Sequence, residues 1–441
     1  MAIACDKCGI ETEIPEAFIK QRKSFRRSFR NECPRCYAES QLAHQRRSLL
    51  WNLAYGALGL VLVLTVPDRI SGWLLLNLFF FQVFLIASIL PHEFGHALVA
   101  RWLGFRVFKV YVGFGKTLFT RNLFGFQTEF RAIPLGGFAL ATPTDARLFR
   151  LKQLAFIFAG PLANLLLCAV ALLFVPLHQL WDFGLLGQTL SPGQVFLYAN
   201  LFILVQNLWP HTFNTPIGKL ASDGKLLWQT LFAKTDMVNN AMAARYVLEA
   251  MNHHEKQQNI EALTWVEQGL ASFPDNFLLL NWRGILLLEQ KHYQAAGDCF
   301  KTLLARSDNS PAVRALMLNN VAYVDALLGG VERLAEADRY SQEAMSLIGW
   351  MPAVKGTRGT ALLESGKIED ALVLLHESMK HADNPSGKAQ NACFISMAEA
   401  RRGNLAESRK YLDEAKKLTP DCFLLERATI EFQNAAAKQG I

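Results

Sequence analysis

Long stretches of the first 230 residues lack any Asp, Glu, Lys or Arg, and these charged residues make up only 19% of the 441-residue chain. About 20 consecutive apolar residues can cross the hydrocarbon core of a bilayer as a helix. The scarcity of charge therefore excludes a purely soluble protein and predicts membrane spans. Four stretches are candidates, although the third contains His178 and the last is shorter: Ser48–Pro67, Ile70–Pro91, Gln153–Trp181 and Gly193–Pro210.

The sequence also lacks an apolar leader, because charged and cysteine-bearing residues precede the first apolar stretch, and we expect no cleaved signal peptide. Lys and Arg accumulate on the cytoplasmic side of membrane proteins. They are abundant before the first stretch and between the second and third, whereas the other two connections hold only Arg69. We therefore expect a multi-pass protein of the bacterial inner membrane with both termini in the cytoplasm. In that reducing compartment the eight cysteines should not form a disulfide framework.

Two Cys-x-x-Cys pairs lie near the N-terminus, at a spacing slightly longer than that of most zinc ribbons. Four thiolates suit a structural zinc site without an open position. The alternative is a disordered tail with free cysteines. The predicted ligands of this zinc-ribbon-like segment are Cys5, Cys8, Cys33 and Cys36.

Between the two pairs, Lys20 to Arg30 combines basic residues with Phe25 and Phe29. Such a pattern could bind nucleic acid or anionic lipid head groups. We favour simple anchoring beside the first membrane span, with the lipid bilayer as partner and no nucleic acid.

Two segments have strand character rather than helical character. Val107 to Val112 and Phe126 to Ile133 are rich in aromatic and β-branched residues and are bounded by Gly and Pro. They predict a small sheet at the cytoplasmic membrane face. A folded loop without a functional role is the alternative.

From about residue 240 the chain repeats. Prolines 274, 311, 352, 385 and 420 recur at intervals of 33 to 41 residues, near the period of about 34 residues of tetratricopeptide units. Gly284, Ala296 and Phe300 fit the small and aromatic packing positions of such a unit, and the unit around Ala322 to Met345 carries extra residues. The segment resembles a tetratricopeptide solenoid, which implies a concave surface for a protein or peptide partner.

His92, Glu93 and His96 form the pattern His-Glu-x-x-His. On a helix, residues at i and i+4 lie on one face, so the two histidines can share a zinc ion while the Glu lies beside the zinc-bound water. Ionisable groups next to a membrane span are costly unless they have a function, although a helix cap is the alternative. Catalytic zinc needs a third protein ligand, for which Asp223 is the candidate. By itself Asp223 could equally be a helix N-cap.

Several motifs follow one another along the chain: HEFGH at 92–96, IPLGGF at 133–138, FAGPLAN at 158–164, NLWP at 207–210 and SDG at 222–224. Their order resembles that of the site-2 protease family of intramembrane metalloproteases, over about residues 50 to 230.

The resemblance implies that His92, His96 and Asp223 bind zinc and that Glu93 acts as general base and then acid. It also implies that Asn164 helps to hold the substrate carbonyl or the oxyanion. The chain departs from the family pattern at 211–221, an insertion before Asp223 that puts the role of Asn207 in doubt. A PDZ-like domain, present in many relatives, is not evident.

Together these features predict a mainly α protein with about four membrane spans, a small cytoplasmic β element, an N-terminal zinc ribbon and a C-terminal α-solenoid. The predicted parts are 1–46, 47–235 and 236–441. The predicted function is an intramembrane zinc endopeptidase with one catalytic and one structural Zn²⁺. It would cut membrane-protein substrates with a transmembrane segment near the cytoplasmic face, with partners selected by the repeats. The alternative is a catalytically inactive membrane scaffold.

Overall fold

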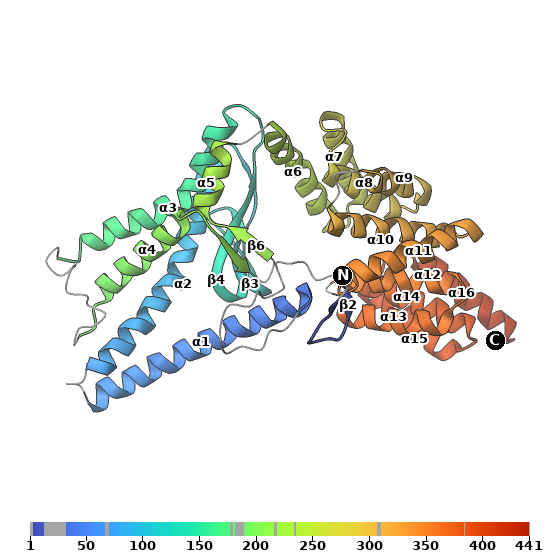
Figure 1. The fold of residues 1–441 in the computed structure, drawn as a ribbon, viewed down its shortest axis with the longest axis horizontal. Coiled ribbons are helices and arrows are strands. Elements are labelled where there is room, and N and C mark those ends of the chain that lie inside the picture. Colours follow the sequence, from blue (N-terminus) through green and yellow to red (C-terminus); the bar gives the residue numbers. More distant parts are fainter. Residues whose placement is uncertain are drawn as a thin grey trace. The chain divides into compact units, whose positions relative to one another are not determined.

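The computed structural model describes residues 3–12, 32–66, 70–176, 180, 189–215, 218–232, 235–306, 310–382 and 384–440. The chain divides into two compact units (Figure 1). One unit comprises Ala38–Leu248, and the other combines Met1–Tyr37 with Glu249–Ile441. The N-terminal segment thus groups with the repeats, whereas the boundaries of the three predicted parts stay a prediction.

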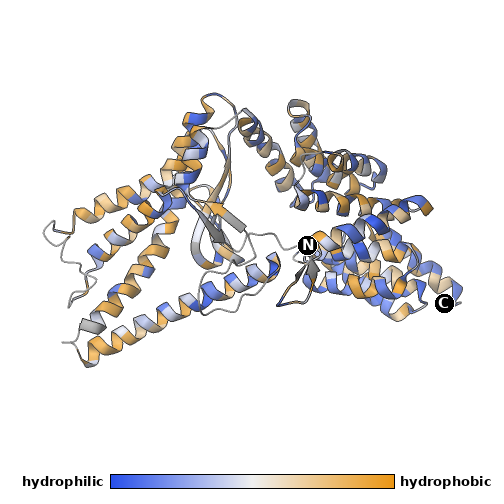
Figure 2. Ribbon diagram, in the orientation of Figure 1, coloured by the Kyte–Doolittle hydropathy of each residue, from blue (hydrophilic) through white to orange (hydrophobic). Residues whose placement is uncertain are grey.

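Helices α1 (Pro34–Thr65), α2 (Ile70–Trp102) and α3 (Phe149–Leu172) are long and apolar enough to cross a membrane. Figure 2 shows mostly hydrophobic residues along α2 and α3 and along the second half of α1, and in α2 and α3 they are not confined to one face. A helix that is apolar all round fits a lipid environment rather than water. Helix α4 (Pro192–Leu208) is equally apolar but has only 17 residues, so the number of spans stays a prediction.

Helix α2 packs against both α3 and α4. Gly95 permits the close approach to α3, because a Cβ atom there would lie 2.6 Å from the carbonyl oxygen of Ala159. Helix α2 does not end at Pro91, as the apolar stretch suggests, but continues to Trp102. The His-Glu-x-x-His pattern therefore lies inside a helix rather than at its end.

A long two-stranded hairpin follows α2 and confirms the predicted sheet. Strand β3 (Arg106–Leu123) pairs antiparallel with β4 (Phe126–Thr142), from Arg106 opposite Thr142 to Leu123 opposite Phe126. Both strands are longer than their aromatic and β-branched stretches, and several register shifts interrupt the pairing. One face of the hairpin packs against α2 through Val110 and Phe126.

The insertion at 211–221 folds as a second hairpin, of β5 (Thr212–Thr215) and β6 (Gly218–Ala221). Its ends meet, since the backbone N–H of Ser222 donates to the carbonyl of His211 over 3.0 Å. Helix α5 (Asp223–Leu231) starts directly afterwards, with the Ser222 side chain as its N-cap. A Cβ atom at Gly224 would overlap the carbonyl oxygen of Leu208, so only glycine lets α5 begin against the end of α4. The insertion therefore loops out without moving Asp223 away from α4.

The other unit contains the repeats. Helices from α8 onward form antiparallel pairs, and Pro311, Pro352 and Pro385 each occupy the first turn of the first helix of a pair. The extra residues around Ala322 lengthen two helices to 18 residues each rather than forming a loop. Helix α6 (Thr235–His254) begins in the first unit and ends in the second. The helices that follow it are α7 (Asn259–Ser272), α8 (Phe277–Glu289), α9 (Tyr293–Leu304), α10 (Pro311–Leu328), α11 (Val331–Ile348), α12 (Pro352–Glu364), α13 (Ile368–His381), α14 (Pro385–Arg401), α15 (Leu405–Leu418) and α16 (Leu425–Lys438).

The N-terminal segment packs against these repeats. Strands β1 (Ile3–Ala4) and β2 (Glu11–Thr12) pair beside α11. Ile10 and Trp350 cover the buried cysteines, and Arg35 Nη2 lies 2.7 Å from Nδ1 of His381. The basic stretch from Lys20 to Arg30 lies outside the described residues.

Candidate metal centre and active site

The three side chains predicted as zinc ligands converge at one point. His92 and His96 lie one turn apart on α2, with their Nε2 atoms 3.3 Å apart. Asp223 Oδ2, from the start of α5, is 3.2 Å from Nε2 of His92 and 3.6 Å from Nε2 of His96. Ligand atoms at bond lengths of about 2.0–2.1 Å in a tetrahedral zinc site lie about 3.3 Å apart. The spacing therefore fits one zinc ion.

The hydrogen bond of the other ring nitrogen of His96 also supports a metal ion at this point. His96 Nδ1 lies 2.8 Å from the carbonyl oxygen of Phe156, which can only accept, so Nδ1 carries the hydrogen and Nε2 offers a lone pair. Asp223 Oδ2 is buried and has no hydrogen-bond partner among the described residues. Lone pairs that face one another repel unless a cation lies among them, so this donor set fits a metal ion.

Glu93 is buried beside this group, and two cavities meet at it. A cavity of about 350 Å³ extends toward β4, α3 and β6, and one of about 360 Å³ runs between α2 and α4. His92, Glu93, Gly137 and Asn207 border both cavities. Both cavities thus lead to the same carboxylate. Asn207, whose role the insertion put in doubt, remains at the site.

Gly160 is a site residue that the sequence motif contains but whose purpose only the structure shows. A Cβ atom there would lie 2.7 Å from Nε2 of His92 and would overlap Nε2 of His96. The glycine in α3 therefore makes room for both imidazole rings. Asn164, one turn further along α3, is fully buried, with Oδ1 2.6 Å from Nδ1 of His92.

The four N-terminal cysteines form a second group that could hold a metal ion. Their sulfur atoms all lie within 4.8 Å of one another, and Cys8 Sγ is 3.9 Å from Cys33 Sγ. The edge of a zinc tetrathiolate is about 3.8 Å at Zn–S bonds of about 2.3 Å. Burial raises the pKa of Cys5, but backbone N–H groups of Cys33, Cys8 and Lys7 outweigh it and lower that pKa to about 7. The thiolate is thus favoured at Cys5, whereas burial raises the pKa of Cys33 to about 11 and that of Cys36 above its usual range.

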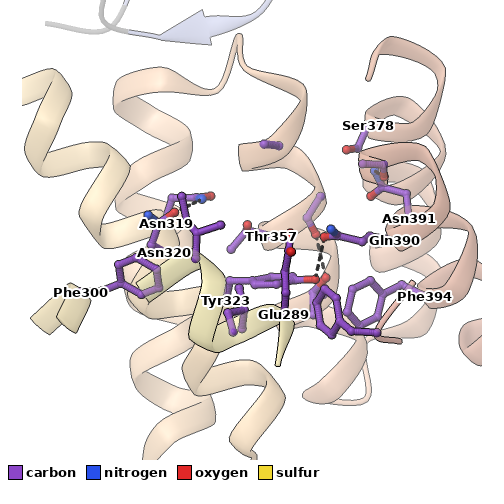
Figure 3. A pocket seen from close by; sticks show the side chains of 17 residues that line it. Glu289, Phe300, Asn319, Asn320, Tyr323, Thr357, Ser378, Gln390, Asn391 and Phe394 are labelled. Carbon is purple, nitrogen blue, oxygen red and sulfur yellow. Dashed lines mark hydrogen bonds between the residues drawn. The ribbon is translucent and has the colours of Figure 1, made fainter. Parts of the chain in front are cut away.

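A cavity of about 230 Å³ lies among α8, α10, α12 and α14 of the repeats (Figure 3). Carboxamide side chains of Asn319, Asn320, Gln390 and Asn391 line it, together with aromatic rings. Among its lining residues only Glu289 carries a charge, and that carboxylate already accepts a hydrogen bond from Asn259. The cavity is therefore close to neutral and rich in amides.

A family model of peptidase family M50 matches residues 80–379, which include His92, Glu93, His96, Asn164 and Asp223. The match extends over 300 of the 441 residues. The chain belongs to peptidase family M50. Together with the apolar helices, membership of M50 associates the chain with a membrane.

The M50 relatives match over short segments. Zinc metalloprotease Rip1 of Mycobacterium tuberculosis is 34% identical over 111 residues, which cover 22% of this chain and 28% of Rip1. Rip1 of Mycobacterium bovis gives the same values. The chain thus spans less than a third of the length of these curated relatives. Among solved structures, the tetratricopeptide protein TTC0263 of Thermus thermophilus covers 44% of this chain and 99% of its own, at 16% identity and a TM-score of 0.35.

Proposed function

We propose that this M50 protein is a zinc endopeptidase that hydrolyses peptide bonds of membrane proteins. The observation that carries the proposal is the convergence of His92, His96 and Asp223 beside Glu93, where two cavities meet. A structural zinc site is closed, whereas a catalytic one has three protein ligands and an open position. This group has three ligand atoms and space next to them.

In the proposed reaction, His92, His96 and Asp223 hold zinc, which would lower the pKa of a bound water to about 7. Glu93 takes the proton of the attacking water and passes it to the leaving amide nitrogen, so it acts first as base and then as acid. Burial of Glu93 on α2 keeps bulk water away from this proton transfer.

A substrate helix must unwind before its carbonyl groups are accessible, because they are engaged in its own hydrogen bonds. Gly137 to Ala139 of β4 border the cavity beside Glu93. We infer that the unwound segment lies along this part of β4 as an added strand. A proline at Ala139 should then reduce cleavage strongly, whereas one at Thr117, on the exposed part of β3, should not. Equal cleavage by both folded variants would contradict strand addition.

The repeats are proposed to select the partner or substrate. Asn319 borders the repeat cavity, and its buried Oδ1 has no hydrogen-bond partner among the described residues. An unsatisfied buried acceptor costs about 1–3 kcal/mol, which a peptide N–H would offset. Asn319→Ala should therefore stabilise the free protein to heat yet reduce substrate cleavage, while Asn404→Ala, outside the cavity, should leave cleavage unchanged. Unchanged cleavage in Asn319→Ala would contradict a role of this cavity.

The distribution of Lys and Arg supports a cytoplasmic position of both termini and of the metal centre, in a bacterial inner membrane. The cut would then fall in the cytoplasmic half of a substrate helix. Cysteine accessibility labelling in intact cells tests the orientation. Labelling of a cysteine at the C-terminus by a membrane-impermeant reagent before lysis would contradict it.

Glu93→Gln in the native host is the test of the proposed activity. We expect a membrane protein to accumulate uncut in that variant, as seen by comparative membrane proteomics. Glu129→Gln is the matched control, because Glu129 is an ion-paired carboxylate on the β3–β4 hairpin. If no membrane protein changes in length or abundance, the alternative of a catalytically inactive scaffold gains support.

A further inference from the structure

Asn164 on α3 makes two hydrogen bonds, one to the metal centre and one to α4. Its Oδ1 lies 2.6 Å from Nδ1 of His92, and its amide nitrogen donates to Oδ1 of Asn200 on α4 over 2.9 Å. The amide nitrogen of Asn200 donates in turn to the carbonyl oxygen of Phe196 over 3.0 Å. Asn164 and Asn200 are fully buried, so no water competes for these groups.

The direction of this series is determined at its far end. The Phe196 carbonyl can only accept, so Asn200 must turn its NH₂ group toward it and its oxygen toward Asn164. Asn164 must then present its NH₂ group to Asn200 and its oxygen to His92. A carboxamide oxygen accepts only, so His92 must carry its hydrogen on Nδ1 and offer the lone pair of Nε2.

We propose that Asn164 and Asn200 are positioning residues that fix the tautomer and ring orientation of His92 for the metal ion. Neither side chain borders the two cavities at Glu93. Asn164 and Asn200 therefore do not face the space that is available to a substrate. His96 needs no such pair, because a backbone carbonyl, that of Phe156, accepts directly from its Nδ1. This inference rests on the proposed function, since it assumes a metal ion at His92, His96 and Asp223.

Zinc affinity distinguishes positioning from a direct action on substrate. Full-length protein in detergent, carrying Cys8→Ser to silence the cysteine group, is titrated with zinc against a chelator. Removal of an outer partner of a metal-bound histidine typically weakens metal binding by about 10–100-fold. We expect a loss in this range for Asn164→Leu and a smaller loss for Asn200→Leu. Asn77→Leu, which removes another fully buried amide of the same unit, should leave zinc affinity unchanged.

Asn164→Asp provides the second readout. Its carboxylate still accepts from Nδ1 of His92, loses the donation to Asn200 and offers no N–H to a substrate oxygen. Positioning predicts that Asn164→Asp retains zinc and cleaves the substrate found through Glu93→Gln. Retained zinc with lost cleavage, or full zinc affinity in Asn164→Leu, would overturn the inference. His96→Ala separates the two claims: if it loses zinc while Asn164→Leu does not, only the positioning role fails, and if wild type binds no zinc there, both fail.

Discussion

The two groups of potential metal ligands differ less in geometry than in what surrounds them. In the cysteine group, Ile10 and Trp350 cover the buried Cys5, Cys33 and Cys36, whereas Cys8 is exposed. The group of His92, His96 and Asp223 opens on two cavities and has a buried carboxylate, Glu93, next to it. Ligand spacing alone would allow zinc in either place. Only the group of His92, His96 and Asp223 has both a cavity and a proton acceptor beside it, as a catalytic metal site requires.

The largest expected difference between the groups concerns cleavage. Glu93→Gln should lower the rate by about 10²–10⁴-fold, the usual contribution of a general acid–base, with the metal content unchanged. Cys8→Ser should retain cleavage near the wild-type level. The cleavage rates are measured on the substrate that accumulates in Glu93→Gln cells. A similar loss of rate in Glu93→Gln and Cys8→Ser would contradict a functional difference between the two groups.

Gly160→Ala should affect zinc binding next most strongly. The added methyl group would overlap Nε2 of His96, so the ring would have to leave its position beside His92 and Asp223. We expect one zinc ion per chain to be lost, and with it the cleavage, while the cysteine-bound zinc remains. Metal analysis of the purified variant is the measurement. A wild-type zinc content in Gly160→Ala would mean that the imidazole rings can shift and that zinc binding does not need glycine at this position.

Cys8→Ser should act on stability instead. Loss of the cysteine-bound zinc would release Ile10, which is partly buried against the cysteines beside Trp350, at a cost of at most about 2 kcal/mol. The effect should appear as lower protection of the α11–α12 connection in hydrogen exchange. Trp350→Ala should reproduce it with the zinc retained. Unchanged protection in both variants would show that the N-terminal segment does not stabilise the repeats.

The smallest expected effect is a pH dependence in the repeats that involves neither metal group. Glu289 accepts a hydrogen bond from His254 and raises the pKa of His254 above its usual value. This contribution to stability is fully present below about pH 6.5 and is lost as the pH rises through the higher pKa of the folded state. Because the pair is partly exposed, it should amount to no more than about 1 kcal/mol. The unfolding temperatures of wild type and His254→Gln should differ below pH 6.5 and converge above pH 8. The same difference at both pH values would contradict this prediction.

The sequence predicts features that depend on local pattern. Helices α1 to α3, the β3–β4 pairing and the helix starts at Pro311, Pro352 and Pro385 all follow from apolar runs, β-branched runs and proline. The spacing of His92 and His96 gives their common face in the same way.

Among contacts between residues far apart in the chain, that of Asp223 with His92 and His96 is expected from the family resemblance, but others could not be predicted. Nothing around Asn200 indicates that it faces Asn164, 36 residues earlier, because the crossing of α3 and α4 decides that contact. The insertion before Asp223 looks disruptive in sequence, yet its hairpin closes on His211 and Ser222 and keeps the ligand in place. Ser222, not Asp223, caps α5, which leaves the Asp223 carboxylate available for a metal.

Zinc X-ray absorption on the purified full-length protein tests the distinction between the two groups most directly. We predict two zinc ions per chain, one with four sulfur neighbours and one with nitrogen and oxygen neighbours. Asp223→Ala should remove only the nitrogen and oxygen signal, and Cys8→Ser only the sulfur signal. A single all-sulfur zinc in the wild type, or loss of both signals in Asp223→Ala, would contradict this prediction.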